Sequence, residues 1–246
     1  MNEIDFSNRI VMVVGGSSGI GNGIARSFRD HGATVFVSGT RPNPADYKKD
    51  DDGSDFSGLN YFQWDVSNDG RVKELKAPFD RLDVLVLSQG AVIYGQGEFE
   101  SAGFRQVIDV NLVSVMNCSM KFHDMLAASK GSIIVIGSGA CFRSTKGNPA
   151  YSASKGGVWA LTRTLAEAWA RDGIRVNGVA PGLVATKMTK VTWNHPRRFQ
   201  DSVEKIPLHR WGTPEEMGGV ALFLASPLAA FVTGEMILAD GGQSLA

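Results

Sequence analysis

The chain of 246 residues lacks the features that would direct it to a membrane, to nucleic acid or out of the cell. No apolar run approaches the roughly 18 residues that a membrane helix needs, and Met1–Asp5 has neither the basic start nor the apolar core of a signal peptide. The 25 basic and 25 acidic side chains cancel, so no cationic excess favours nucleic acid. Two cysteines are too few for a secreted disulfide scaffold, which predicts a reducing, cytoplasmic setting.

The composition is that of an ordinary globular protein. Hydrophobic residues make up 43% of the chain and charged residues 20%, which argues against disorder. The length suffices for one large domain with a well-buried core, and no linker divides the chain. We therefore expect a single domain over residues 1–246, and a net charge of zero permits that domain to self-associate.

Apolar runs alternate with segments of helical periodicity along the chain. Residues 10–14 are continuously apolar, as in a strand buried on both faces. Ile20, Ile24 and Phe28 recur every four residues, which predicts a helix over 20–31. The other expected strands are 34–37, 61–64, 84–87, 132–136, 175–179 and 235–239, and the other expected helices are 103–123, 150–171 and 214–225. This alternation predicts an α/β fold, a doubly wound parallel sheet with helices on both faces.

Two stretches have a less regular pattern. Residues 42–58 are rich in Lys and Asp, which predicts a solvated surface loop with at most a short helix. Residues 187–212, the lid segment, are polar with scattered Pro and Trp. Because a long connection in a compact domain is often functional, we expect this segment to cover a substrate site.

The first strand is followed by a glycine-rich turn, Gly15-Gly16-Ser17-Ser18-Gly19-Ile20-Gly21. Glycine at the first position permits a tight turn, at the fifth a close approach to phosphate, and at the seventh close packing of helix and strand. The helix that begins here directs its N–H groups and positive dipole end toward an anion. A plain tight turn would explain the motif taken alone, but its place between strand and helix predicts a pyrophosphate cradle. The residues of this cradle are Gly15, Ser17, Ser18, Gly19, Ile20 and Gly21.

The second strand indicates which dinucleotide is bound. An enzyme that prefers NAD usually has an acid at the end of this strand, whereas here Ser38-Gly39-Thr40-Arg41 follows and no acid occurs before Asp46. Arg41, assisted by Ser38 or Thr40, can bind a 2′-phosphate. The sequence therefore favours NADP(H), with NAD(H) possible. An exposed Arg41 with no such role is the alternative.

Three further positions follow later strands. The Asp65 carboxylate could accept from an adenine amino group with Val66 stacked on the ring, although an aspartate at a strand end is often a helix cap. Gly90 would let the backbone lie against the ribose.

A catalytic constellation lies in the second half of the chain. Tyr151 and Lys155 are four residues apart, on one face of an expected helix. A free tyrosine has a pKa near 10, and we expect the lysine ammonium to lower it so that Tyr151 can exchange a proton with a carbonyl or alcohol. Ser138 ends a strand, where open α/β sheets place their sites, and could hold the substrate oxygen. Either motif alone would be an ordinary packed pair or turn.

Taken together, these residues resemble the short-chain dehydrogenase/reductase family over essentially the entire chain. Gly15, Gly19 and Gly21, then Asp65, Asn111, Ser138, Tyr151 with Lys155, and Pro181-Gly182 occur in the family's order. The resemblance implies a Rossmann domain with about seven parallel strands, assembled as a homotetramer or dimer. It also implies that Asn111 holds a water in a proton relay past Lys155. The resemblance further implies that four residues contact the nicotinamide: Pro181, Gly182, Val184 and Thr186.

One departure from the family pattern follows the fourth strand. The chain has Leu87-Ser88-Gln89-Gly90 where the family usually shows Asn-Asn-Ala-Gly. We expect a changed local hydrogen-bond pattern there, with catalysis retained.

The sequence thus predicts reversible hydride transfer between a nicotinamide and a secondary alcohol or ketone, with no metal. Several residues could form an apolar substrate pocket: Val92, Tyr94, Ala140, Phe142, Met188 and Trp193. Arg197 and Arg198 could instead meet an anionic substrate or carrier. A 3-oxoacyl-thioester reductase therefore stays open, as do an epimerase or dehydratase on the same scaffold and a non-catalytic, cofactor-sensing protein.

Overall fold

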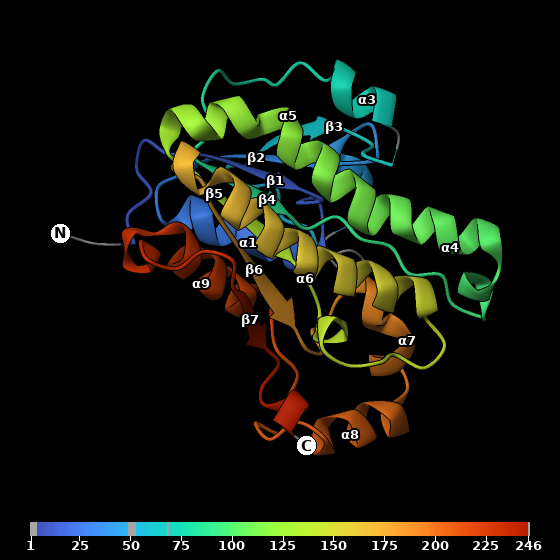
Figure 1. The fold of residues 1–246 in the computed structure, drawn as a ribbon. Coiled ribbons are helices and arrows are strands. Elements are labelled where there is room, and N and C mark those ends of the chain that lie inside the picture. Colours follow the sequence, from blue (N-terminus) through green and yellow to red (C-terminus); the bar gives the residue numbers. More distant parts are fainter. Residues whose placement is uncertain (1–3, 49–52, 68, 246) are drawn as a thin grey trace.

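The computed structural model describes residues 4–48, 53–67 and 69–245. Seven parallel strands form one sheet in the order β3-β2-β1-β4-β5-β6-β7 (Figure 1). The strands are β1 Ile10–Val14, β2 Thr34–Gly39, β3 Asn60–Gln63, β4 Val84–Leu87, β5 Ser132–Ile136, β6 Arg175–Pro181 and β7 Met236–Ala239. The strand order reverses between β1 and β4, and such a switch point leaves a crevice at the carboxyl ends of the strands.

Helices cover both faces of this sheet, which confirms the predicted fold class. The helices are α1 Gly19–Asp30, α3 Asp69–Glu74, α4 Ser101–Ile108, α5 Ser114–Ser129, α6 Pro149–Trp169, α7 Lys190–Trp193, α8 Pro196–Glu204 and α9 Pro214–Ala225. Helices α4, α5 and α6 lie on one face and α1 and α9 on the other (Figure 1). Among the described residues, no helix is long and apolar enough to cross a membrane.

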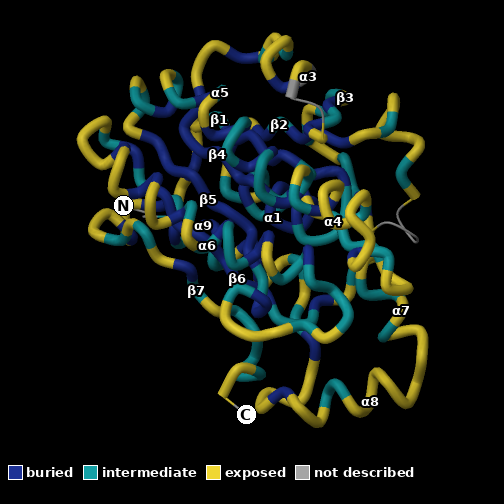
Figure 2. The backbone as a smooth tube through the Cα atoms, turned by 45° about the vertical axis from the view of Figure 1, so that its right-hand side comes forward, coloured by how far each residue is buried: buried dark blue, intermediate teal, exposed yellow. Residues whose placement is uncertain are grey.

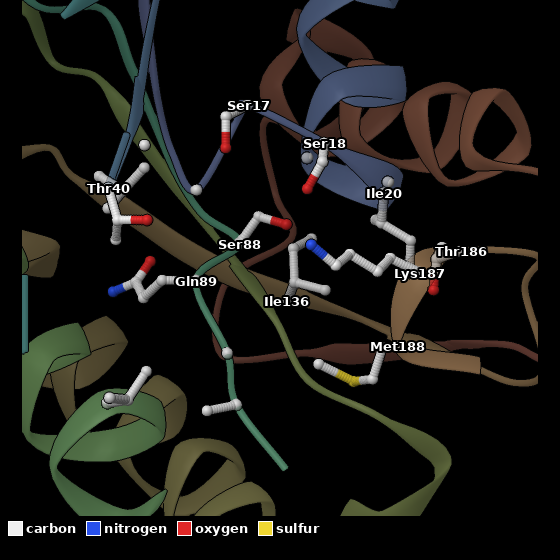
Figure 3. Close-up of a pocket in the computed structure, with 18 of the residues that line it drawn as sticks. Ser17, Ser18, Ile20, Thr40, Ser88, Gln89, Ile136, Thr186, Lys187 and Met188 are labelled. Carbon is white, nitrogen blue, oxygen red and sulfur yellow. The ribbon is translucent and has the colours of Figure 1, made fainter. Parts of the chain in front are cut away.

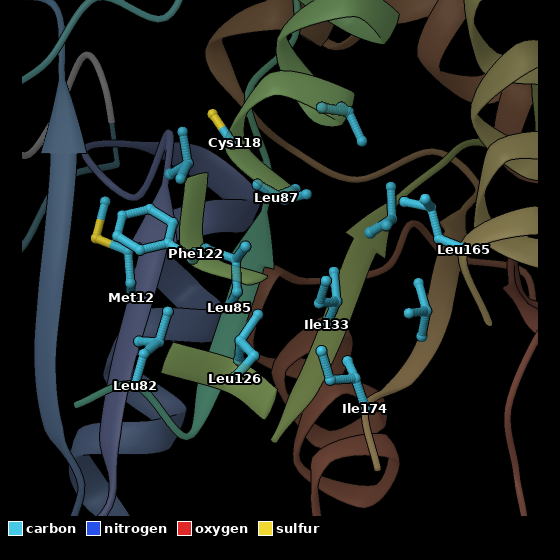
Figure 4. Close-up of a cluster of buried hydrophobic side chains, with 14 of the residues drawn as sticks. Met12, Leu82, Leu85, Leu87, Cys118, Phe122, Leu126, Ile133, Leu165 and Ile174 are labelled. Atoms are coloured by element: carbon cyan, nitrogen blue, oxygen red, sulfur yellow. The ribbon is translucent and has the colours of Figure 1, made fainter. Parts of the chain in front are cut away.

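Alternation along the strands divides the core between the two faces. Met12, Leu85 and Ile133 point toward α5 and α6, where they meet Phe122 and Leu126 (Figure 4). The intervening strand residues pack against α1 and α9 in a second cluster. Figure 2 shows the strands as a buried centre, whereas α8 is largely exposed. The continuous apolar runs of the sequence therefore mark strands buried on both faces, as predicted.

Helices α1 and α9 pack unusually closely because glycine lies at their contact. A Cβ on Gly23 would lie 2.3 Å from the Cβ of Pro214, and a Cβ on Gly218 would lie 2.0 Å from Ser27 Oγ. Thr213 caps α9 at this contact, since its Oγ1 accepts from Glu216 N at 3.3 Å. The helix after the glycine turn and the helix after the lid segment are thus fixed to one another.

The prediction of one continuous helix over 103–123 is wrong. Helix α4 ends at Ile108, a π-helical turn spans Asp109–Val113, and α5 continues to Ser129. A π turn inserts one extra residue into a helix and often occurs at functional sites. Its position here follows from long-range hydrogen bonds of Asn111, described below, which no local pattern indicates.

The lid segment is also more regular than expected. It contains a 3-10 turn over Lys187–Thr189 and the helices α7 and α8. Pro196 occupies the first turn of α8, a position that favours proline, and Arg198 N donates to His195 Nδ1 at 3.4 Å. Within 42–58 the structure has a short 3-10 turn over Pro44–Asp46, as expected, and 49–52 of this stretch lie outside the described residues.

Candidate active site

The carboxyl ends of the central strands open into one cleft of about 640 Å³ (Figure 3). Ser138, Tyr151 and Lys155 line it, together with every predicted cofactor-binding residue except Ser38. Strand β2 continues to Gly39, so Ser38 lies inside the sheet and its side chain is fully buried. The fold therefore brings segments from across the sequence to one place, and Ser38 is not among them.

The glycine turn has the geometry that its spacing predicts. Gly15 and Gly19 have φ of +73° and +53°, in the left-handed region that favours glycine. A Cβ on Gly21 would lie 2.3 Å from the carbonyl oxygen of Gly15. Asn22 Nδ2 donates to Gly16 O at 3.1 Å and to Asp55 O at 3.0 Å, which holds the turn from behind. The N-terminus of α1 thus meets the cleft with free N–H groups in its first turn.

Replacing Gly21 by alanine should damage both the fold and the cradle. The new methyl group would collide with backbone, so we expect the free energy of unfolding to fall by about 1–3 kcal/mol, with loss of dinucleotide binding. Gly219→Ala is the matched control, because nothing lies within 4 Å of a Cβ at this position of α9; it should be neutral or stabilising by up to about 1 kcal/mol. Denaturant unfolding and a binding titration measure both effects. Equal behaviour of the two variants would contradict the packing argument.

The far end of the cleft holds a guanidinium group in a fixed position. The Cζ atom of Arg41 lies 4.4 Å above the ring centroid of Tyr47, and Arg41 N donates to the Tyr47 hydroxyl at 3.0 Å. Arg41 also donates to the backbone oxygen of Asp46. Burial raises the pKa of Tyr47, but hydrogen bonds with Ser17 and the Arg41 backbone outweigh it and lower that pKa. The sequence analysis did not identify Tyr47 as a residue of the cleft, because a lone aromatic residue in a polar loop does not indicate a binding site.

Asp65 and Val66 line the cleft next to this group. The Asp65 Oδ1 atom accepts from Ser67 N at 3.0 Å and from Ser67 Oγ at 2.7 Å. These bonds shape the turn after β3. Helix α3 begins only at Asp69, so Asp65 forms a turn and lines the cleft without capping a helix.

The catalytic candidates meet at the ends of β5 and α6. Ser138 Oγ accepts from Ala140 N at 3.1 Å and is hydrogen-bonded to the side chain of Tyr151. Lys155 is only 5% exposed, and its Nζ donates to Ile136 O at 2.8 Å. Burial lowers the pKa of Lys155 to about 8. A serine hydroxyl, a phenol and a buried amine therefore lie together on rigid elements.

The pKa of Tyr151 differs from the expectation. Burial raises it and the hydrogen bond with Ser138 opposes that effect, with a net rise. The Lys155 ammonium lies 5.8 Å from the phenol ring centroid and bonds to a backbone oxygen, so the lowering predicted from the four-residue spacing is not seen.

Asn111 lies behind the cleft and does not line it. It is fully buried in the π turn. Its Nδ2 donates to Ala91 O and Ser154 Oγ, both at 3.0 Å, and its Oδ1 accepts from Ala91 N at 2.7 Å. A Cβ on Gly90 would lie 3.7 Å from this Oδ1 and 4.0 Å from Lys155 Nζ. Asn111 thus ties the segment after β4 to helix α6, directly beside Lys155.

Gln89 occupies the place where the sequence departs from the family pattern. Its Nε2 donates to Ser114 Oγ at 3.0 Å, whose hydroxyl donates in turn to Val110 O at 2.6 Å. Gln89 Oε1 is buried without a hydrogen-bond partner in the described part of the chain. Gln89 therefore braces the segment after β4 against the π turn, the kind of local change that was expected.

The first three residues of the lid segment, Lys187, Met188 and Thr189, line the cleft on the side of β6. Lys187 extends its side chain into the cleft (Figure 3), and Tyr94 donates from the opposite wall to Met188 O at 2.8 Å. Of the six residues expected to form an apolar pocket, only Met188 lines the cleft. Phe142 packs instead on Trp159, with ring centroids 5.8 Å apart. Apart from its place after Thr186, no feature of the sequence singles out Lys187 as a residue of the cleft.

The two cysteines take no part in the cleft. Cys118 is buried in the core, and Cys141 Sγ donates to Lys155 O at 3.1 Å. Burial raises the pKa of both thiols, which disfavours the reactive thiolate. Within the described residues, no group of three or more His, Cys, Asp or Glu side chains could hold a metal ion.

Comparison with known proteins agrees with this geometry. A family model described as enoyl-(acyl carrier protein) reductase matches residues 14–244. The 3-oxoacyl-(acyl-carrier-protein) reductase of Chlamydia muridarum is 35% identical, over 96% of this chain and 98% of its own. The 2-dehydro-3-deoxy-D-gluconate 5-dehydrogenase of Pseudoalteromonas atlantica is 32% identical, over 98% of each chain.

A solved structure gives the same result at the level of the fold. The structure of a putative 2-deoxy-D-gluconate 3-dehydrogenase from Agrobacterium tumefaciens, with bound NADP, has a TM-score of 0.89 and 30% identity, and covers 100% of both chains. The resemblance drawn from the motifs is therefore confirmed. The chain belongs to the short-chain dehydrogenase/reductase family and is an oxidoreductase.

Proposed function

We propose that the chain catalyses reversible hydride transfer between NADP(H) and a secondary alcohol or ketone, with Tyr151 as the acid/base. The observation that carries this proposal is the pairing of the Ser138 and Tyr151 side chains at the cleft, one helical turn from the buried Lys155. Proton exchange with a carbonyl needs such a hydroxyl within hydrogen-bond reach of the substrate oxygen.

The residues present fit a nicotinamide dinucleotide phosphate. The glycine turn offers the N-terminus of α1 to the pyrophosphate, and Arg41, held against Tyr47, offers a charged fork to the 2′-phosphate. A related Agrobacterium protein of known structure binds NADP. When bound, the nicotinamide supplies the hydride acceptor or donor, and the protein positions it.

The side chains of the cleft divide the remaining work. Ser138 and Tyr151 hold the substrate oxygen from two sides and orient the carbonyl. Tyr151 gives its proton to that oxygen in the reductive direction and takes one in the oxidative direction. Lys155 holds positive charge near the phenol and would bind the ribose hydroxyls of the cofactor. Asn111 would hold a water of the relay that returns a proton to Tyr151 past Lys155. Val184 and Thr186 would bind the carboxamide group of the nicotinamide.

The first test is a fluorescence titration of the purified protein with NADPH and with NADH, followed by assays on a panel of ketones. Tight NADPH binding and weaker NADH binding would support the proposal. If neither binds, the assignment of the glycine turn fails.

Replacing Arg41 by alanine should weaken NADPH binding by roughly 10- to 100-fold, since a hydrogen bond to a charged group contributes about 1.5–3 kcal/mol. NADH, which has no 2′-phosphate, should bind almost as in the wild type. The matched control is Arg171→Ala, an exposed arginine beyond the end of α6. The ratio of the two dissociation constants is the measurement, and an equal loss for both cofactors would remove the 2′-phosphate role.

A second candidate function is reduction of a 3-oxoacyl thioester. The relative from Chlamydia muridarum favours it, and the lid segment carries Arg197 and Arg198 in exposed positions where an anionic carrier could meet them. Turnover of a 3-oxoacyl thioester well above that of small ketones would select this candidate.

The proposal extends to the whole assembly. The chain acts as one catalytic domain over 1–246, with 187–212 as substrate lid, in the cytoplasm and as a homotetramer or dimer. The unpaired thiols of Cys118 and Cys141 support a reducing compartment. Size-exclusion chromatography with light scattering tests the assembly.

A further inference from the structure

A buried carboxylate lies close to the proposed active site without belonging to the cleft. Glu98, in the short 3-10 turn Gly97–Phe99 between β4 and α4, is 0% exposed. Glutamate is rarely fully buried unless it is paired, and an uncompensated buried charge is costly. The surroundings of Glu98 therefore have to supply donors.

Three N–H groups from two segments meet this carboxylate. Glu98 Oε1 accepts from Ile93 N at 3.0 Å and from Asn148 Nδ2 at 3.2 Å. Glu98 Oε2 accepts from Tyr151 N at 2.9 Å. Both oxygens are thus engaged, and one of the donors is the backbone of the proposed acid/base itself.

Glu98 does for helix α6 what a capping residue normally does. The first N–H groups of a helix have no partner within the helix, and Asn148, which precedes α6, makes no side-chain bond to them. Asn148 donates instead to Glu98, and Glu98 accepts from the third residue of the helix. The negative charge also lies at the positive end of the helix dipole.

The same carboxylate holds the opposite wall of the cleft. Through Ile93 it fixes the segment that runs from Ala91, which lines the cleft, to Tyr94. Tyr94 in turn donates to Met188 O in the lid segment. One side chain therefore joins the acid/base, the post-β4 wall and, through Tyr94, the lid.

We propose that Glu98 is a positioning residue that sets the place of Tyr151 relative to the substrate wall, a role that rests on the proposed function. Glu98 does not touch the reacting atoms. It acts by holding the first turn of α6 and residues 91–94 in one geometry, and a misplacement of about 1 Å can cost on the order of 100-fold in rate.

Its charge adds a second, separable effect. The titratable groups around the phenol of Tyr151 are Cys141, Tyr94, Glu98 and Lys155. After burial and the bond to Ser138, the ionised forms of Cys141 and Tyr94 and the carboxylate of Glu98 each raise the pKa of Tyr151. Removing the charge of Glu98 while keeping its shape should therefore lower the pKa of Tyr151.

The test compares Glu98→Gln and Glu98→Ala with Glu100→Gln, an exposed glutamate two residues away. We expect Glu98→Ala to reduce kcat on the order of 100-fold per folded site. Glu98→Gln, which keeps one acceptor, should lose less and shift the pH profile of alcohol oxidation to lower pH. Glu100→Gln should match the wild type. A merely structural role would lower the melting temperature and leave the pH profile of the folded enzyme unchanged.

Amide hydrogen exchange gives a readout that does not need turnover. Exchange in 91–94 and at the start of α6 should quicken in both Glu98 variants and not in Glu100→Gln. Unchanged exchange, kcat and pH profile in folded Glu98 variants would overturn the positioning role. Absence of activity in the wild type and Glu100→Gln alike, with the exchange result intact, would sink the proposed function and leave the anchoring by Glu98 standing.

Discussion

Replacing Tyr151 by phenylalanine should leave NADPH binding nearly intact and reduce kcat by about 10²- to 10⁴-fold, the usual contribution of a positioned general acid or base. Phenylalanine keeps the half-buried ring in the first turn of α6 and the backbone bond to Glu98. It removes only the hydroxyl that is bonded to Ser138. Steady-state kinetics with NADPH and a ketone, next to a binding titration, separates loss of chemistry from loss of the site.

Tyr94→Phe provides the matched control for this experiment. Tyr94 does not line the cleft, and its hydroxyl donates to the backbone oxygen of Met188, so it has no proton to exchange with the substrate. This variant should change KM more than kcat. Wild-type turnover in Tyr151→Phe would refute the assignment of the acid/base.

Replacing Lys155 by methionine should lower the activity of the enzyme without lowering its stability at neutral pH. Activity should fall by on the order of 100-fold or more, because the proposed site loses the amine that would bind the cofactor ribose and take part in the proton relay to Tyr151. Stability should move the other way at neutral pH, since methionine fills similar volume without a buried ammonium, and replacing buried charge by apolar groups is often neutral or stabilising. Kinetics and denaturant unfolding of the two proteins measure the opposed effects.

The pH dependence of that stability has a defined sign. Burial lowers the pKa of Lys155 to about 8, whereas a lysine in the unfolded chain titrates near 10.4. Between these values the unfolded state binds more protons, so the wild type gains stability as the pH rises. The advantage of Lys155→Met should therefore shrink by up to roughly 3 kcal/mol across this window, at about 1.4 kcal/mol per pKa unit. Lys76→Met, at an exposed position, should show no such trend.

The parts of the site that were predictable are those fixed by local physics. The turn Gly15–Gly21 needs left-handed backbone and close packing that only glycine tolerates. Its place in the cleft could therefore be predicted from the spacing of its glycines. The strands β1, β4, β5 and β6 could be predicted because both of their faces are buried and their sequences are largely apolar. Helix α9 was predicted at its observed bounds, since Thr213, Pro214 and Glu216 form a complete start signal.

What the sequence could not reveal depends on contacts between distant segments. The π turn reflects the bonds of Asn111 to Ala91 and Ser154. Glu98 meets Tyr151 across a separation of 53 residues. Ser38 was misplaced because strand β2 continues two residues beyond the expected end at residue 37, to Gly39, which puts Ser38 inside the sheet. In each case the position of the residue depends on a distant part of the chain. Neither the periodicity nor the residue spacing of its own segment indicates that contact.

The close contact of α1 and α9 bears on how such an enzyme diversifies. The lid segment begins soon after β6 and ends at the start of α9, and Gly23 and Gly218 lock α9 against the helix that follows the glycine turn. Both ends of the segment are therefore anchored on the frame that holds the dinucleotide. Recombination between Thr186 and Thr213 would exchange the lid segment as a unit, so that substrate preference changes while the glycine turn, Val184 and Thr186 are inherited unaltered.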